Sequence, residues 1–237
     1  VDGHVGQDAV ALVAGGRGAG VFKGGVDFED AANFSVADEV AAEAKRAQQK
    51  THFGRVFAIC VEKNSELPEG HPSRKFKGRV VFQGNNVKDE NWQVAMFQEL
   101  GSSPATMEAG KACDAYGLAP GCDVQQADAE QAYIQSRLGG PVTTWIRLPE
   151  DRRPAHWKGI VDPVCPLVLA LYGHPDAGGY WEKHCHAHLL DVGFTPVREW
   201  RSCYVHKKLG LFLVVYVDDF KMAGPTGTMV SLWQSIP

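Results

Sequence analysis

LFLVVYVDDFKMAG, residues 211 to 224, is an apolar run, then two adjacent aspartates, then a second apolar run. Apolar stretches rich in β-branched and aromatic residues on both sides of a polar pair predict a β-hairpin. Asp218 and Asp219 at its turn would repel each other and lose hydration, unless a cation or an exposed turn relieves them. An ordinary acidic turn would also fit this segment alone. The sequence on either side of the hairpin is therefore needed to choose between a cation-binding turn and an ordinary acidic turn.

Other strands are expected outside this hairpin. Residues 54–62 and 76–83 are rich in β-branched and aromatic side chains and flank a connection that contains Pro, Gly and Ser, which predicts two antiparallel strands. Because strands and helices are expected to mix without regular alternation, the predicted fold class is α+β. Further strands are expected at 121–128, 142–148, 202–206 and 211–217.

Three helices are expected. The first covers about 35–50, with Ser35 as its cap, acidic residues in its first turn and basic residues near its end. The second covers about 104–116, and the third starts after Pro175 and runs to Val192. The second helix is expected to begin at the Ser103-Pro104 pair and to end at Gly117, and the third to end at Gly193.

Composition limits the classes of protein to consider. The chain has 237 residues, 44% of them hydrophobic and 22% charged, which is typical of a globular protein. No run approaches the roughly 18 apolar residues that a membrane span needs, so a soluble protein is expected. The six cysteines form no CxxC pair, which favours reduced thiols in an intracellular protein. A net charge of −4 argues against a dedicated nucleic-acid binder, unless cations cluster locally.

The first 33 residues are rich in glycine, which predicts a flexible leader. Val10–Val21 imitates a dinucleotide-binding loop, but its glycines do not have the GxGxxG spacing. The chain starts with Val1 rather than Met, and we therefore expect a piece of a longer protein.

Several segments resemble blocks of the copia-type retrotransposon reverse transcriptase. Tyr216-Val217-Asp218-Asp219 resembles the family's YxDD signature, and further similar blocks lie in the family's order over about residues 54–224. These further blocks are Lys77–Val81 (KARLV in the family), Gln126–Tyr133 (QMDVKTAF), Thr144–Pro149 (VYMRQP), and Leu171–Gly173 with Tyr180-Trp181 (LYGLKQAPRAWY).

The resemblance implies an RNA-directed DNA polymerase, a nucleotidyltransferase of a transposable element. The implied organisation is a leader over 1–33, an N-terminal helix and fingers over 34–120, and a palm over 121–237. The palm would be an antiparallel sheet packed on helices, and no thumb would follow. Implied partners are an RNA template, a DNA primer, deoxynucleoside triphosphates, and the integrase and RNase H of a parent polyprotein. The implied location is a cytoplasmic particle rather than a secreted form.

The resemblance also implies site residues. Asp128, Asp218 and Asp219 would be catalytic and would hold two Mg²⁺ ions, with Mn²⁺ as a substitute. Such ions bridge the attacking and leaving oxygens of a phosphoryl transfer, and Mg²⁺ prefers carboxylate and phosphate oxygens to sulfur. Tyr133 would lie beneath the sugar of the incoming nucleotide and exclude a ribose. The other substrate-binding residues would be Lys77, Arg79 and Tyr216.

The basic residues of 74–79 form a local cluster of positive charge in a chain whose net charge is negative. Lys75, Lys77 and Arg79 alternate along a predicted strand, so they share one face and could contact a triphosphate or a template backbone. Arg74 is expected to make general contacts to a nucleic-acid backbone. The alternative is a solvated edge strand that is protected by its charge.

Two departures from the family favour a second hypothesis. His174–Gly179 replaces a segment that carries lysine, glutamine and arginine in the family, and the chain ends shortly after the aspartate hairpin. This fragment alone is therefore expected to be weak or inactive. The alternative is an inactive or domesticated remnant that keeps the fold and binds nucleic acid or a partner.

A third hypothesis is a zinc-stapled interaction module. His184 and His188 lie four residues apart on the third predicted helix, as zinc ligands often do, and Cys203 with His206 could complete four-coordination. Cys185 and His186 lie between the two helical histidines. No recognised finger spacing is present, so packed or solvated histidines are the alternative.

Overall fold

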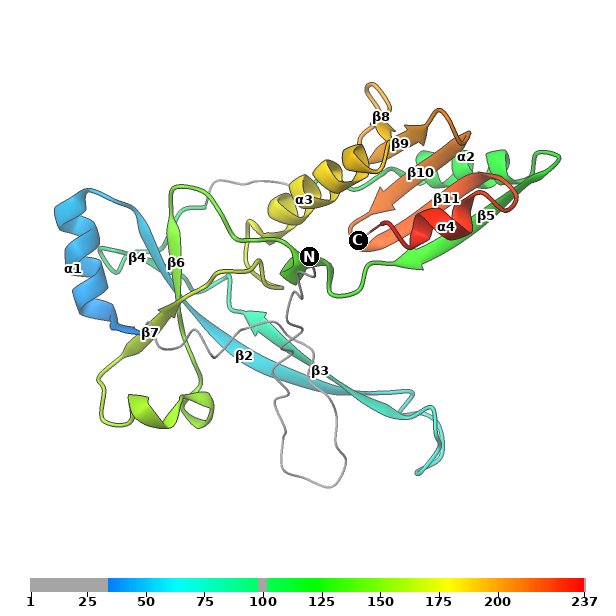
Figure 1. Ribbon diagram of the computed structural model, residues 1–237. Helices are drawn as coiled ribbons and strands as arrows, with labels where there is room; N and C mark the ends of the chain where they lie inside the picture. Colours follow the sequence, from blue (N-terminus) through cyan, green and yellow to red (C-terminus); the bar gives the residue numbers. More distant parts are fainter. Residues whose placement is uncertain (1–33, 98–101, 237) are drawn as a thin grey trace, which may run out of the picture. The chain divides into compact units, whose positions relative to one another are not determined.

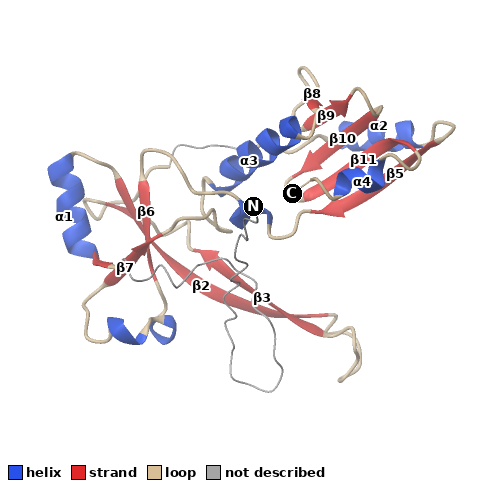
Figure 2. Cartoon of the chain, viewed as in Figure 1, coloured by secondary structure: helices blue, strands red, loops and turns tan. Residues whose placement is uncertain are grey.

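The computed structural model describes residues 34–97 and 102–236 (Figure 1). Contacts between residues divide the chain into two compact units. The first unit contains the described residues up to 97 together with 137–177, and the second contains 102–136 together with 178–236. The predicted flexible leader lies outside the described residues. Both units mix helices and strands (Figure 2), which confirms the α+β class.

The first unit is built on a six-stranded sheet. Its order is β1 (Ser35–Val36), β7 (Pro163–Pro166), β6 (Thr143–Arg147), β2 (Thr51–Lys63) and β3 (Lys75–Phe82), and β4 (Lys88–Asp89) also pairs with β2. β2 and β6 are parallel, and the other pairs are antiparallel. Helix α1 (Ala37–Ala47) buries Ala37 and Ala41 against Phe53 and Val164.

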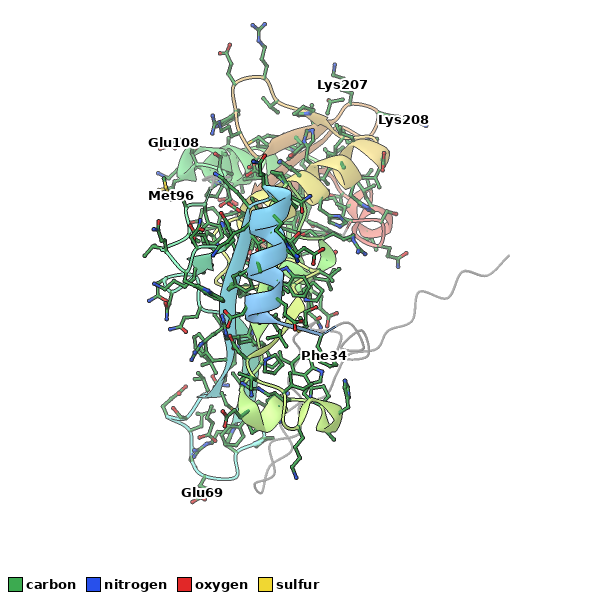
Figure 3. All side chains as sticks on the ribbon, turned by 90° about the vertical axis from the view of Figure 1, so that its left-hand side faces the viewer. Phe34, Glu69, Met96, Glu108, Lys207 and Lys208 are labelled. Atoms are coloured by element: carbon green, nitrogen blue, oxygen red, sulfur yellow. The ribbon has the colours of Figure 1, made fainter. Side chains whose placement is uncertain are left out.

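Strands β2 and β3 form a long hairpin, as predicted. Glu69 lies near its tip (Figure 3). The register pairs Ile59 with Arg79 and Val61 with Lys77, so odd-numbered residues of both strands share one face. The predicted common face of Lys75, Lys77 and Arg79 is thus confirmed, and all three side chains are exposed.

The second unit is built on a five-stranded antiparallel sheet. Its order is β5 (Cys122–Asp128), β11 (Asp219–Pro225), β10 (Leu211–Tyr216), β9 (Cys203–His206) and β8 (Thr195–Pro196). The helices are α2 (Met107–Gly117), α3 (Ala177–Asp191) and α4 (Met229–Trp233). Short 3₁₀ turns cover Ala132–Gln135 in this unit, and Glu150–Arg152 and Ala155–Trp157 in the first.

Helices cover both faces of this sheet because the strands are apolar on both sides. Leu213, Val215, Phe220 and Met222 point to the face that packs on α3. There α3 contributes three buried residues at helical spacing, Trp181, Cys185 and Leu189. Val214 and Ala223 point to the opposite face and pack on Ala109 and Cys113 of α2.

Two helix starts differ from the prediction. Ser35 is not the cap of α1, because it pairs with Val164 in β1, and α1 begins at Ala37 after Val36 without a side-chain cap. Ser103 does not start α2 either, since the helix begins at Met107 and Ser103 Oγ accepts an Arg201 N–H at 2.6 Å. The capping residue is Thr106, whose Oγ1 accepts the Ala109 N–H at 3.4 Å.

The end of α2 also differs. Gly117 is still helical, and the cap residue is Leu118. A Cβ at position 117 would collide with the side chain of Val124, so this glycine allows the helix to approach β5 closely. The end of α3 agrees with the prediction, because Gly193 has a φ of +96°.

The unit boundary differs from the predicted cut at residue 120. Residues 137–177 lie with the N-terminal part of the chain because β6 pairs in parallel with β2. Residues 102–120 lie with the C-terminal part because α2 packs on β10 and β11. Among the described residues, no helix has both the length and the apolar character to cross a membrane.

Candidate active site

The aspartate pair closes the β10–β11 hairpin of the second unit. Val217 and Asp218 form its two-residue turn, and Asp219 is the first residue of β11, opposite Tyr216. On its other side, β11 pairs with β5, and this register places Asp219 directly opposite Asp128. Side chains on directly opposed residues share a face, with Cβ atoms about 5 Å apart. Two carboxylates that are ninety-one positions apart in sequence thus become close neighbours.

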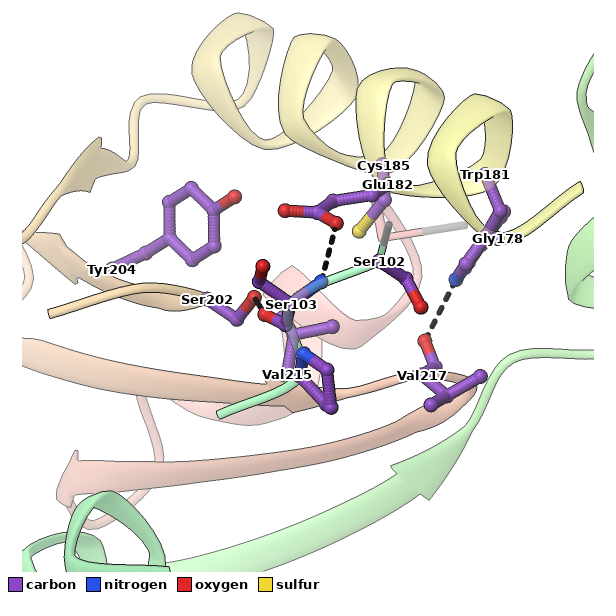
Figure 4. Close-up of a pocket in the computed structure, with 11 residues that line it drawn as sticks. Ser102, Ser103, Gly178, Trp181, Glu182, Cys185, Ser202, Tyr204, Val215 and Val217 are labelled. Carbon is purple, nitrogen blue, oxygen red and sulfur yellow. Dashed lines mark hydrogen bonds between the residues drawn. The ribbon is translucent and has the colours of Figure 1, made fainter. Parts of the chain in front are cut away.

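The turn is held in an unfavourable conformation by two hydrogen bonds. Val217 has a φ of +59°, which is rare for a β-branched residue and costs about 1–2 kcal/mol. The Trp181 indole N–H donates to Val217 O at 2.7 Å (Figure 4), and the Ala129 N–H donates to Asp218 O at 2.7 Å. Both turn carbonyls are therefore satisfied from neighbouring elements, which fixes the path of the chain at the carboxylates.

A strap before α2 fixes the same end of β10. The Ser103 N–H donates to Glu182 Oε2 at 2.9 Å, and Ser103 O accepts the Ser202 hydroxyl at 2.6 Å (Figure 4). The Ala105 N–H then donates to Val215 O at 3.1 Å. Because α2 follows this strap directly, these bonds fix where the helix lies on the sheet.

A hollow of about 900 Å³ opens beside the two opposed carboxylates. Its wall is the sheet face of β5, β10 and β11 on one side and α2 on the other. Asp128, Asp219 and Tyr216 line it near the turn, and Lys111 lines it from α2. Farther from the turn, Lys221 Nζ binds both carboxylate oxygens of Asp114 at 2.7 and 2.8 Å. Near the turn, the hollow is therefore lined by the carboxylates of Asp128 and Asp219.

The aspartates are not neutralised within the part of the chain that the structure describes. No ion pair or side-chain hydrogen bond there reaches the carboxylates of Asp128, Asp218 or Asp219, and the neighbouring Lys221 is already paired with Asp114. Like charges that lie directly opposite each other destabilise a sheet. Such an arrangement is relieved by a bound cation.

The predicted set of three ligands is only partly assembled. Register brings Asp128 and Asp219 together, while Asp218 lies in the turn. Over residues 34–97 and 102–236, no three His, Cys, Asp or Glu side chains are placed to hold a metal ion together. The donor set is thus a pair of carboxylates with a third close by in the chain.

The two predicted tyrosines lie on the same unit. Tyr216 ends β10, is 56% exposed and lines the hollow. Tyr133 lies in the turn after β5 and packs, half-buried, against the core below α3. Burial raises the pKa of Tyr133, and the negative charge of Asp218 raises it further. Tyr133 is therefore within electrostatic reach of the turn.

The two predicted basic residues belong to the first unit. Lys77 and Arg79 lie on β3, and the Arg79 guanidinium stacks over the ring of Tyr172 at 5.6 Å. They are exposed on the odd-numbered face of the hairpin.

The proposed zinc ligands do not converge. His186 Nδ1 is hydrogen-bonded to the Tyr204 hydroxyl, and His188 Nε2 to Ser235 O. The His206 ring packs edge-on against Phe194. Cys185 and Cys203 are buried, and burial raises the pKa of their thiols to about 12 and about 11. Among the described residues, no three of these side chains are grouped as metal ligands.

Two residues of the site were not found by sequence reasoning. Val217 looked like part of an apolar run, and only its backbone angle shows that it is strained. Trp181 was expected to be part of an apolar helix face, and it is also the donor that holds the turn. The YW pair at 180–181 was the only signal for it. Comparison of the sequence with protein-family models and with curated proteins finds no match.

Proposed function

We propose that the chain is a metal-dependent nucleotidyltransferase of the reverse-transcriptase type, which extends a DNA primer on an RNA template. The observation that carries the proposal is the register of β5 and β11, which opposes Asp128 and Asp219 beside a strained turn and an open hollow. Strained backbone that is held by its surroundings is concentrated at functional sites.

The chemistry of the carboxylates fits a divalent cation. Mg²⁺ is usually bound through one or two carboxylates, with waters and substrate phosphates in the remaining positions. Asp128 and Asp219 supply two carboxylates that make no ion pair among the described residues, and Asp218 directly precedes Asp219. The bound ions would lower the barrier by neutralising charge on the transferring phosphoryl group.

The residues of the chain would supply positioning. Tyr216 is exposed beside the carboxylates and offers a ring on which a base or sugar can pack. Tyr133 lies within electrostatic reach of Asp218, and its ring would limit the sugar that enters. Lys77 and Arg79, on the first unit, offer cations that would bind phosphate groups.

Metal binding by the whole chain gives the first test. Titration with Mn²⁺, followed by electron paramagnetic resonance, should show binding that is weakened at least tenfold in Asp128→Asn and in Asp219→Asn. Asp191→Asn is the matched control, because Asp191 is exposed at the end of α3. Equal Mn²⁺ affinity in all three variants and the unaltered chain would reject the proposed site.

Primer extension gives the second test. With an RNA template, a DNA primer, deoxynucleotides and Mg²⁺, activity should fall by at least about 100-fold in either aspartate variant, since such ligands act on the transition state. Ribonucleotides should be poor substrates. Retained extension in Asp219→Asn would exclude this residue from catalysis.

A non-catalytic, nucleic-acid-binding remnant is the second candidate. The observation that favours it is that no three metal ligands come together in the described part of the chain. This candidate predicts nucleic-acid binding that is the same with and without Mn²⁺, together with no primer extension.

A further inference from the structure

Two adjoining hollows lie beside the first half of β2, in the first unit. One has a volume of about 530 Å³ and the other about 470 Å³, and Arg55, Arg147 and Asp162 line both. Gln83 and Arg153 also line the larger hollow, and Lys88 lines the smaller one. Because they share three lining residues, the two hollows adjoin, and together they are called the depression below.

One arginine of this group has a structural role. Arg147 makes two hydrogen bonds of 2.7 Å to the two carboxylate oxygens of Asp162. Its guanidinium also lies over the rings of Phe53 and Trp92, at 5.8 and 5.3 Å. The two hydrogen bonds and the two ring contacts hold Arg147 and Asp162 in place. The Arg147 guanidinium also balances the negative charge of Asp162.

Two further arginines surround this pair. The Arg147 hydrogen bonds lower the pKa of Asp162, and the charges of Arg55 and Arg153 lower it further, so both guanidinium groups lie within electrostatic reach of one carboxylate. Arg153 donates one N–H, to Leu148 O at 3.3 Å. Within the described ranges, the Arg55 side chain makes no hydrogen bond or ion pair.

The depression is therefore lined by more positively charged side chains than negatively charged ones. Three arginines and Lys88 face two carboxylates, Asp162 and Glu150, and Asp162 is already paired. This local excess of positive charge occurs in a chain with a net charge of −4. Guanidinium groups with free donors are suited to bind phosphate oxygens.

Each hollow has a partly exposed aromatic ring, and the Trp92 ring of the smaller one is already in contact with Arg147 and Phe53. Phe57 lines the larger hollow and is 42% exposed, and Trp92 lines the smaller hollow and is 36% exposed. Stacking of a base on such a ring contributes about 1–3 kcal/mol. The larger hollow therefore combines phosphate-binding donors with the exposed Phe57 ring, the two features that a nucleotide site requires.

We propose that this depression binds a nucleotide phosphate through Arg55 and Arg153, with the adjoining base on Phe57. The ligand is either a free nucleotide or one nucleotide of a nucleic-acid strand. The site lies entirely in the first unit and does not require the aspartates of the second. It can therefore be correct whether or not the chain is a polymerase.

Binding by the full chain in the absence of divalent ions tests the site. A fluorescein-labelled oligothymidylate would be followed by fluorescence anisotropy, and adenosine monophosphate and inorganic phosphate by calorimetry. Arg55→Gln and Arg153→Gln should each weaken binding about tenfold, because each removes charge-assisted hydrogen bonds. Arg46→Gln on the exposed side of α1 makes the same charge change elsewhere and should leave the affinity unaltered.

The outcomes separate the two sources of the phosphate. Comparable affinity per site for the mononucleotide and the oligonucleotide would identify a free nucleotide, while binding of the oligonucleotide alone would identify a strand. For a strand, each arginine variant should also reduce the slope of log affinity against log salt by about 0.7. Unaltered binding in the double variant Arg55→Gln/Arg153→Gln, with thermal unfolding like that of the unaltered chain, would overturn the proposal.

Discussion

At the scale of single residues, Val217 links backbone strain to the placement of the carboxylates. A β-branched residue at a φ of +59° stores energy that the Trp181 and Ala129 hydrogen bonds offset. Glycine adopts the same φ without the Cβ penalty. Strain at this position should therefore be separable from the chemistry of the neighbouring aspartates.

Val217→Gly should increase the free energy of unfolding by about 1 kcal/mol, because the backbone strain is removed. The same variant should bind Mn²⁺ with unaltered affinity, because the Trp181 and Ala129 hydrogen bonds to the turn carbonyls are kept. Urea unfolding measures the first effect, and the paramagnetic titration described above measures the second. Val161→Gly is a control at an exposed position without positive φ, and it should be neutral or slightly destabilising. A loss of stability in Val217→Gly would show that the turn is not strained.

At the scale of elements, His174 holds the connection between β7 and α3 on the sheet of the first unit. Its Nε2 is hydrogen-bonded to Thr144 Oγ1 of β6, and its Nδ1 accepts the Asp176 N–H. The ring packs against Phe82 and Phe97 and is buried. Burial, with a smaller contribution from the charge of His52, lowers the pKa of His174 to about 4.

This pKa predicts a loss of stability in mild acid. The unfolded chain takes up the His174 proton near pH 6.5, whereas the folded chain takes it up only near pH 4. Stability that is present above pH 6.5 is therefore lost as the pH falls toward 4, by roughly 3 kcal/mol at about 1.4 kcal/mol for each pH unit. In His174→Gln, urea unfolding between pH 7 and pH 4.5 should depend less on pH.

The matched control for this effect is His71→Gln, because His71 is exposed in the connection between β2 and β3. Its pH profile should follow that of the unaltered chain. If His174→Gln and the unaltered chain lost equal stability over this range, the His174 ring would not be the group that titrates.

The sequence predicted the positions of helices and strands better than it predicted which strands pair. The aspartate hairpin, the long hairpin and α3 were all predictable, because alternation, helical spacing and glycine punctuation are local signals. The parallel pairing of β6 with β2 was not, since no local feature specifies a partner strand ninety residues away. The cap of α2 was assigned to Ser103 rather than Thr106, because the Arg201 side chain meets the Ser103 hydroxyl only in the folded chain.

For the candidate site, too, the residues could be predicted from the sequence but their arrangement could not. Asp218 and Asp219 stood out as carboxylates between apolar runs, and Asp128 was marked by resemblance alone. Their meeting depends on the register of β5 with β11, which one residue of slip would destroy. The strained turn, its Trp181 donor and the hollow beside α2 arise from tertiary contacts and carry no separate sequence signal.

At the scale of the whole molecule, charge is distributed unevenly. The chain is acidic overall, yet the odd-numbered face of the β2–β3 hairpin carries a row of cations. Phe57, Ile59 and Val61 are exposed beside that row on the paired strand. Cations interleaved with exposed apolar side chains favour a single-stranded nucleic acid over a duplex, because unpaired bases offer their faces for packing. The row consists of Lys63, Lys75, Lys77 and Arg79.

Lys75→Gln/Lys77→Gln should therefore weaken binding of single-stranded nucleic acid and make it less dependent on salt. Each phosphate contact contributes about 0.7 to the slope of log affinity against log salt for single strands, so two lost contacts should lower the slope by about 1.4. Lys207→Gln/Lys208→Gln is the matched control, because both lysines are exposed in the β9–β10 turn (Figure 3). Anisotropy titrations over a range of salt concentrations measure both pairs. Equal slopes for the two variants would mean that net charge, rather than the hairpin face, governs binding, and Lys77 would then lose its role in the proposed function.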